Sequence, residues 1–223
     1  MQANSISSVV RGREAALARV QALSGLTFAL FLGVHLVNVL LAPFGPALHD
    51  AVQGSLRAAY QAPPVELVVV LGALVVHVST GVIRARRRQH AVRNQATRWQ
   101  RRLGWGLVVI VFGHTLATRG PSLVYGVWPE FAGISFSLNW LPAWFYPYYL
   151  AFGLAAAFHG GLGVLRALRL LGWRPATPGR RGAALLLGAL AVLLLVALLA
   201  YGGVLFPIAD PMANDYAKLY LGP

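Results

Sequence analysis

Five long apolar stretches, separated by short segments rich in arginine, restrict the folds open to this chain. A helix needs roughly 20 consecutive apolar residues to cross a bilayer. We place the crossings at residues 20–41, 65–84, 103–119, 146–166 and 182–205. Only 11% of the 223 residues are charged, whereas a soluble domain carries about a quarter. The sequence therefore predicts an all-α, polytopic membrane protein that forms one domain over residues 1–223, with no convincing internal repeat.

The positions of the basic residues predict the orientation of the helices. Sixteen of the 19 Lys and Arg residues lie before the first stretch, between the second and third, or between the fourth and fifth. These segments share one side of the membrane, and cytoplasmic loops carry the excess of Lys and Arg. We expect a cytoplasmic N-terminus, an external C-terminus and a bacterial cytoplasmic membrane location. Because the net charge of +13 is confined to these segments, nucleic-acid binding is not expected.

Four of the six histidines lie inside apolar stretches, one in each of the first four: His35, His77, His114 and His159. An ionisable side chain inside a membrane is costly and indicates a functional site. Successive helices run in opposite directions, which places the first and third of these histidines in the outer half and the second and fourth in the inner half. The two levels should lie about 10 Å apart. Each level offers two histidines, enough for both axial ligands of a haem b. The other two, His49 and His90, are expected in solvated loops.

Metal sites of other kinds fit the four histidines less well. Without cysteine, the chain can hold no iron–sulfur cluster of its own and no thioether-linked haem. Both methionines, Met1 and Met212, lie outside the apolar stretches. A zinc or di-metal site would need carboxylates, and the only acid in a proposed crossing is Glu66, at its outer edge. Structural histidines within a helix bundle remain the alternative to two haems.

Two arginines stand at the same spacing from the inner histidines. Arg84 follows His77, and Arg166 follows His159, by seven residues. Each arginine therefore lies two turns away on the same helix face. From there it can hold a haem propionate by charge-assisted hydrogen bonds. An arginine that extends its charged group to the membrane surface is an equal alternative.

The histidine arrangement resembles that of the dihaem cytochrome b anchor of succinate dehydrogenase and fumarate reductase, in the class in which one five-helix chain carries both haems. Local stretches add to the resemblance: Ser24-Gly25 ahead of Phe31-x3-His35-x2-Asn38, Glu66 leading into His77-x3-Gly81, Arg102-Leu103-Gly104 ahead of Gly113-His114, and Phe158-His159 followed by Gly160, Gly161 and Gly163. The resemblance implies an outer haem on His35 and His114, and an inner haem on His77 and His159. It also implies a four-helix haem bundle with a fifth helix beside it. Some members carry a glutamate where Ala157 stands here, so their proton route is not expected.

The resemblance also implies a function and partners. The chain would be the electron-transfer subunit of a succinate:quinone oxidoreductase, passing electrons between a cytoplasmic iron–sulfur subunit and a membrane quinone, which we expect to be menaquinone. The succinate or fumarate chemistry would lie on a flavoprotein subunit, because this chain contains no Gly-rich nucleotide loop and no cysteine cluster. The alternatives are a cytochrome b that serves another quinone-linked dehydrogenase, hydrogenase or reductase, and a non-haem transporter or assembly protein.

Quinone candidates occur near both sides of the membrane. The inner candidates, near the starts of the first and third crossings, are Arg19, Ser24 and Trp99. The outer candidates are Glu66 and an aromatic loop that contains Trp128, Trp140, Trp144, Tyr146 and Tyr148. Aromatic residues are also enriched wherever a protein meets the membrane–water interface, and we favour an interfacial role for the loop.

Overall fold

The computed structural model describes residues 2–62, 64–87 and 94–222, with side chains from residue 12 onward. Every regular element in these ranges is a helix. Five helical segments are long and apolar enough to cross a membrane: α1 (Gln2–Val39), the π-helix η2 (Val65–Gly72) continued by α3 (Ala73–Arg87), α4 (Gln95–Tyr125), α6 (Pro142–Leu170) and α7 (Arg180–Tyr201). The predicted all-helical membrane fold with five crossings is confirmed.

The third crossing is longer than the apolar stretch that predicted it. The expected segment 103–119 is the shortest of the five, yet α4 runs for 31 residues. Asn94 begins this helix, because its side-chain oxygen accepts hydrogen bonds from the backbone N–H groups of Ala96 (2.9 Å) and Thr97 (3.4 Å). These bonds satisfy donors that a helix N-terminus leaves free. The helix ends at Gly126, whose φ of 69° suits a residue without a side chain.

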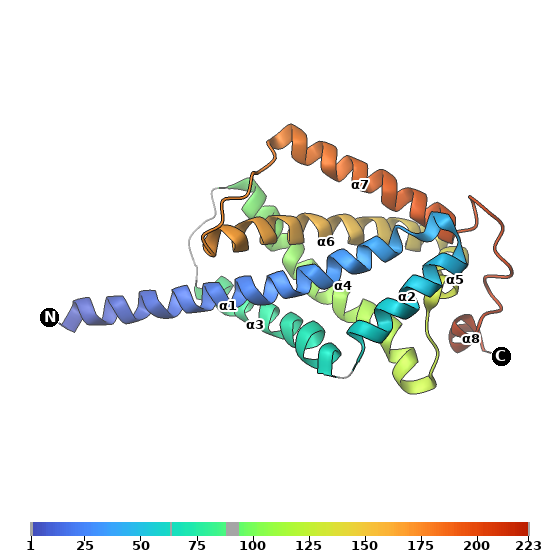
Figure 1. Cartoon of the computed structure of the whole chain (residues 1–223), viewed down its shortest axis with the longest axis horizontal. Helices are drawn as coiled ribbons and strands as arrows, with labels where there is room; N and C mark the ends of the chain where they lie inside the picture. The colour runs from blue at the N-terminus through green and yellow to red at the C-terminus, as the bar shows by residue number, and fades with distance from the viewer. Residues whose placement is uncertain (1, 63, 88–93, 223) are drawn as a thin grey trace.

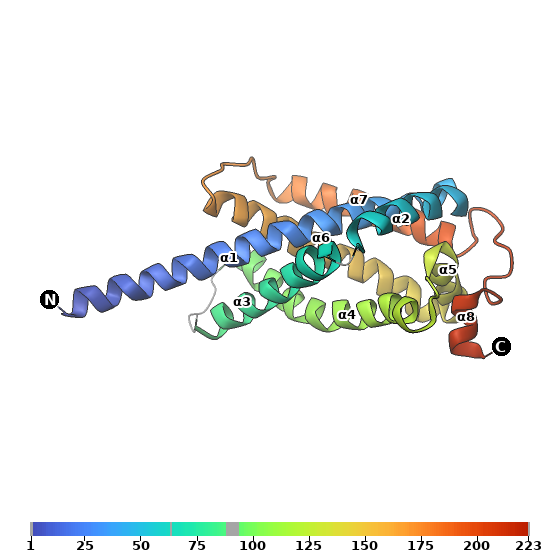
Figure 2. The same ribbon diagram turned by 60° about the horizontal axis from the view of Figure 1, so that its bottom comes forward.

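Four of the crossings, α1, α3, α4 and α6, form a bundle, and α7 lies against α6 (Figures 1 and 2). α1 packs along both α3 and α6, and α4 packs along α6. Within the described ranges, neither α1 with α4 nor α3 with α6 makes extended backbone contact. The end of α3, the start of α4 and the connection between α6 and α7 share one end of the bundle, on the left in Figure 1. We call this the basic end, because it holds Arg84, Arg102, Arg166 and Arg181.

Three short helices cover the opposite end of the bundle: α2 (Pro46–Tyr60), α5 (Glu130–Trp140) and α8 (Asp215–Leu221). We call it the capped end, and the C-terminus lies there (Figure 1). A short 3-10 helix, η1 (Ala42–Phe44), leads from α1 into α2. The main apolar core lies at this end, where Phe131 and Leu138 of α5 pack against Leu198 and Tyr201 of α7. The crossings are therefore held together most tightly at their capped end.

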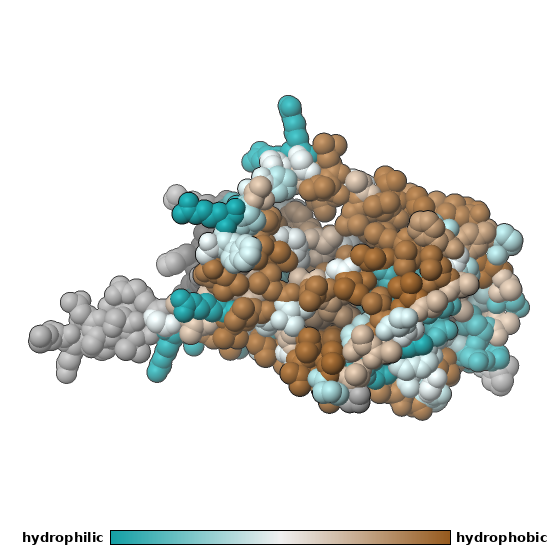
Figure 3. Space-filling model, in the orientation of Figure 1, coloured by the Kyte–Doolittle hydropathy of each residue, from teal (hydrophilic) through white to brown (hydrophobic). Residues whose placement is uncertain are grey.

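The surface between the two ends is apolar. In Figure 3 hydrophobic residues cover most of the middle of the bundle, and hydrophilic residues gather at the basic end and around α2. Large apolar side chains such as Leu30, Val109 and Leu185 are more than two-thirds exposed. Such outward-facing side chains suit helices whose solvent is lipid.

The segment expected to be an aromatic loop is mostly helical, so that prediction was wrong. Only Trp128 of its five named aromatic residues lies between helices, whereas Trp140 ends α5 and the other three lie in the first turns of α6. The prolines of this segment start helices: Pro129 is the N-cap of α5, and Pro142 occupies the first turn of α6. Proline suits the first helical turn because its missing N–H would be unpaired there anyway.

Candidate functional site

The structure brings the four membrane histidines together in two pairs. The ring centres of His35 in α1 and His114 in α4 lie 6.1 Å apart, with the ring planes inclined by 65°. Those of His77 in α3 and His159 in α6 lie 6.3 Å apart, with an inclination of 88°. Each pair joins two helices that do not pack directly against each other, so the histidines meet across the interior of the bundle. These are the pairs expected from depth alone.

The two pairs occupy different levels, and Gly25 of α1 marks their separation. A Cβ added to Gly25 would come within 2.8 Å of Cε1 of His77, so this glycine lies at the inner level. His35 follows Gly25 by ten residues, which corresponds to about 15 Å along a helix. The two pairs are therefore separated along the bundle, as expected from the sequence.

Each inner histidine is oriented by a backbone carbonyl group. Nδ1 of His77 lies 3.2 Å from the carbonyl oxygen of Gln21, and Nδ1 of His159 lies 2.9 Å from that of Gln100. A carbonyl oxygen can only accept, so Nδ1 carries the proton in both rings and Nε2 keeps a free lone pair. An imidazole that donates its second N–H to a backbone carbonyl is the usual arrangement of a metal-binding histidine.

The same two glutamines hold the two arginines that follow the inner histidines. Nη1 of Arg84 donates to Oε1 of Gln21, and Nη1 of Arg166 donates to Oε1 of Gln100. Arg166 also donates to Oγ1 of Thr97 at 2.7 Å. Each guanidinium is thereby held against the neighbouring helix on the basic side of the inner pair, where an anionic group of a cofactor could reach it.

Sequence analysis did not identify Gln21 and Gln100 as functional residues. Gln21 lies midway along α1 and Gln100 near the start of α4, and a single glutamine at either place gives no motif. A comparison of spacings would have found them, because each lies 14 residues before the outer histidine of its helix.

The outer pair lies among aromatic rings. His35 stacks on Phe31, with centres 6.0 Å apart and planes inclined by only 13°. The ring of His114 meets that of Phe152 edge-on, with centres 5.2 Å apart, and the ring centre of Tyr148 lies 6.0 Å from that of Phe152. The outer pair thus has flat apolar walls, whereas the inner pair has hydrogen-bonding partners.

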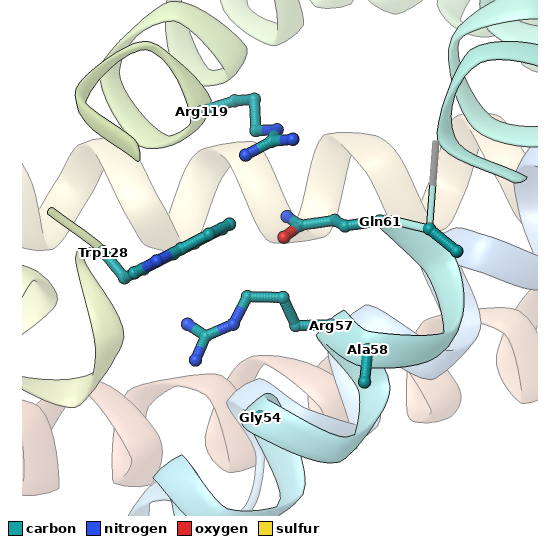
Figure 4. Close-up of a pocket in the computed structure, with 7 residues that line it drawn as sticks. Gly54, Arg57, Ala58, Gln61, Arg119 and Trp128 are labelled. Atoms are coloured by element: carbon teal, nitrogen blue, oxygen red, sulfur yellow. The ribbon is translucent and has the colours of Figure 1, made fainter. Parts of the chain in front are cut away.

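A second polar site lies at the capped end, around the indole ring of Trp128. A pocket of about 370 Å³ is lined by Gly54, Arg57, Ala58, Gln61, Ala62, Arg119 and Trp128. Figure 4 shows the indole between two guanidinium groups, with Cζ of Arg57 4.3 Å and Cζ of Arg119 5.2 Å from its ring centre. Both distances lie within the range of a cation–π interaction. The pocket therefore combines a flat aromatic wall with two cations.

Two glutamates neutralise these arginines. Nε and Nη2 of Arg119 donate to the two carboxylate oxygens of Glu66 at 2.6 and 2.7 Å. Both terminal nitrogens of Arg57 donate to Oε1 of Glu130 at 3.2 Å. Glu66 lies in the π-helix η2, a form that is rare and often found at functional sites. Oε1 of Gln61 is buried and, among the described residues, receives no hydrogen bond, so this pocket can offer an acceptor to a bound donor.

His49 is buried in α2, so its prediction as a solvated loop residue was wrong. The residue is 1% exposed, and the rings of Phe131 and Tyr201 meet it edge-on. Nδ1 lies 2.7 Å from a carboxylate oxygen of Asp50, and Nε2 lies 3.2 Å from the side-chain nitrogen of Asn38. The prediction failed because this segment folds as an amphipathic helix, whose buried face includes the histidine. His49 therefore belongs to the core of the capped end.

The quinone candidates predicted near the inner side of the membrane do not form one site. The Ser24 hydroxyl donates to a carbonyl of its own helix at 2.8 Å. Arg19 is exposed, and Trp99 is exposed on α4 with Cζ of Arg102 5.5 Å from its ring centre. His90 lies outside the described residues.

Within the part of the chain that the structure describes, no three His, Asp or Glu side chains gather as a metal-ion site would require. The membrane histidines occur in twos, an arrangement that suits a cofactor bringing its other metal ligands with it. Comparisons with known proteins found no matching family model, no matching curated protein and no matching solved structure.

Proposed function

We propose that the chain is the membrane-anchor, dihaem cytochrome b subunit of a succinate:quinone oxidoreductase in a bacterial cytoplasmic membrane. One observation carries the proposal: two histidine pairs, at two levels of the bundle, have the spacing of axial haem ligands. A bound haem supplies one-electron chemistry, so the chain would serve as the electron-transfer subunit of the enzyme. The succinate or fumarate chemistry would belong to a partner flavoprotein.

The separation of the rings fits two imidazoles on one iron. A metal–imidazole bond measures about 2.0 Å, and the centre of a five-membered ring with bonds of about 1.35 Å lies about 1.2 Å from each atom. Two imidazoles on opposite sides of a metal therefore have ring centres about 6.3 Å apart, close to the 6.1 and 6.3 Å of the two pairs.

The chain's own residues would bind and orient the two haems. His77 and His159 would offer Nε2 to the inner iron, because their Nδ1 protons are already donated to carbonyl groups. Arg84 and Arg166 would hold propionates on the basic side of the inner pair. His35 and His114 would bind the outer haem, with aromatic side chains excluding water around them.

The distribution of charge supports a partner at the basic end. Basic loops face the cytoplasm in membrane proteins, where an iron–sulfur subunit and a flavoprotein would dock. The inner histidine pair is the nearer of the two to this end, which suits the entry of electrons there.

The pocket around Trp128 supports a quinone site at the capped end. A quinone ring could lie against the edge of the indole, and its carbonyl oxygens could accept from Arg57 or Arg119. A quinol hydroxyl could donate to Oε1 of Gln61, which otherwise has no donor among the described residues. Of the quinone candidates, Trp128 itself lines this pocket, and Glu66 binds Arg119, which also lines it. We propose that menaquinone reacts here, with Glu66 as the group that exchanges protons.

Single replacements of the histidines test the proposal. We expect two haems per wild-type chain, measured as pyridine haemochrome and in reduced-minus-oxidised spectra. His77→Leu and His159→Leu should each remove the same haem, while His35→Leu and His114→Leu should each remove the other. His90→Leu serves as the control and should retain both. A wild-type chain without b-type absorption bands, or a folded His77→Leu variant with both haems, would overturn the proposal.

A further inference from the structure

The inner histidine pair is built from two copies of one local sequence, so the expectation of a chain without an internal repeat was wrong at this site. The first helix of each copy pairs a glutamine with a glycine and an outer histidine: Gln21-x3-Gly25-x9-His35 in α1, and Gln100-x3-Gly104-x9-His114 in α4. The second helix pairs an inner histidine with a glycine and an arginine: His77-x3-Gly81-x2-Arg84 in α3, and His159-x3-Gly163-x2-Arg166 in α6. The pair α1 and α3 is therefore repeated by α4 and α6.

The hydrogen bonds repeat together with the spacing. In the first copy the carbonyl group of Gln21 accepts from His77, and its side-chain oxygen accepts from Arg84. In the second copy Gln100 makes the same two contacts, with His159 and Arg166. One glutamine in each copy thus orients an imidazole through its backbone and a guanidinium through its side chain.

Gly25 and Gly104 occupy equivalent places in the two copies, and each lies in close contact with an inner imidazole ring. A Cβ on Gly25 would lie 2.8 Å from Cε1 of His77, and a Cβ on Gly104 would lie 2.8 Å from Cε1 of His159. Real Cβ atoms essentially never come this close to another heavy atom. Glycine at both positions therefore lets α1 and α4 approach the imidazole rings closely enough for the carbonyl groups of Gln21 and Gln100 to accept their hydrogen bonds.

The outer pair has no such arrangement. Among the described residues, neither ring of His35 and His114 takes part in a hydrogen bond, and both contact phenylalanine rings instead. The paired glutamines are therefore specific to the inner level.

We propose that Gln21 and Gln100 are positioning residues for the inner haem, and that the two copies hold it as equivalent halves of one clamp. The inference rests on the proposed function, because it takes His77 and His159 as ligands of one iron. The side chain of each glutamine holds the guanidinium group of one arginine on the basic side of the inner pair. A nearby positive charge favours the reduced form of a haem, because that form carries one electron more. The backbone carbonyl keeps each imidazole turned with Nε2 toward the site.

Redox titration of the purified, haem-loaded protein tests the clamp, and His77→Leu identifies which component is the inner haem. In Gln21→Leu and Gln100→Leu the arginine loses its acceptor, so the inner haem should become harder to reduce by a similar amount in both variants. The double variant should show about the sum of the two shifts, since equivalent and separate contacts add. The outer haem should titrate as in the wild type.

Glycine replacements test the other half of the clamp. Gly25→Ala and Gly104→Ala should each displace one inner imidazole, and so change or abolish the ferric electron paramagnetic resonance signal of the inner haem alone. Gly106→Ala is the matched control on α4, because nothing lies within 4 Å of its added Cβ. It should leave both signals unchanged. If the alanine variants at Gly25 and Gly104 fail to fold, the glutamine variants decide the question.

The outcomes separate this inference from the function on which it rests. A wild-type chain without haem refutes the proposed function. A dihaem wild type whose inner potential is unchanged in both glutamine variants refutes only the clamp. Equal shifts of both haems in Gln21→Leu and Gln100→Leu also refute it, because a positioning role must act on the inner level alone.

Discussion

Replacing Glu66 with glutamine should destabilise the contact between η2 and α4 more than any change to an exposed ion pair. The carboxylate receives two charge-assisted hydrogen bonds from Arg119, at 2.6 and 2.7 Å, and the two side chains are only 15% and 20% exposed. Removing one partner of a buried pair costs about 3–5 kcal/mol, because the other charge is left uncompensated. Arg119 keeps a bond to Oγ of Ser122 at 2.8 Å and its contact with Trp128. We therefore expect a smaller loss than this, about 2–3 kcal/mol.

A double-mutant cycle separates this pair from its surroundings. Unfolding by sodium dodecyl sulfate in mixed micelles, followed by tryptophan fluorescence, would give the free energy of unfolding of Glu66→Gln, Arg119→Gln and the double variant. The double variant should be less destabilised than the sum of the single ones by about 1–2 kcal/mol, which measures the coupling. Asp215→Asn is the control, because its partner Lys218 lies in an exposed pair of α8. If Glu66→Gln unfolds no more easily than this control, the structural role of the ion pair is refuted.

Two further changes test local features of the fold. Asn94→Ala removes the acceptor for two backbone N–H groups at the start of α4, so it should lower the free energy of unfolding by about 1 kcal/mol, and Asn94→Ser should restore most of it. Equal stability of the alanine and serine variants would contradict the capping role. His49→Phe leaves Asp50 and Asn38 without their buried partner and should cost about 2 kcal/mol. The folded variant should keep both haems, and loss of either haem from it would contradict the placement of His49 outside the two membrane pairs.

The five crossings and the two histidine levels could be predicted because each depends on a property read along one helix. A run of apolar residues is enough to predict a crossing, and the fixed rise of a helix places His35 and His114 at one level and His77 and His159 at another. Because successive crossings run in opposite directions, the histidines of alternate crossings then fall at the same level and form a pair. None of these steps needs knowledge of how the helices are rotated against one another.

The hydrogen-bond partners could not be predicted in this way, because they depend on that rotation. Gln21 reaches His77 only because α1 packs along α3 with Gly25 facing the imidazole. The short helices of the capped end were missed for another reason. α2 and α5 are too short to cross a membrane, so the search for apolar stretches of membrane-spanning length did not find them. His49 and Trp140 were consequently assigned to connecting segments, although both lie in helices.

Buried side chains are unevenly distributed along the described part of the bundle. The largest fully buried side chains, among them Tyr201, Phe131 and Phe136, all lie at the capped end. Only Ala73 and Thr80 of α3 are buried, both with small side chains. Apolar side chains gain little by leaving lipid for a protein interior, so the capped end, with its packed aromatic rings and ion pairs, must hold the crossings in register. The side chains at the two histidine levels then do not have to hold the helices together. A haem that binds only the folded bundle would add its binding free energy to the stability of the helices around it.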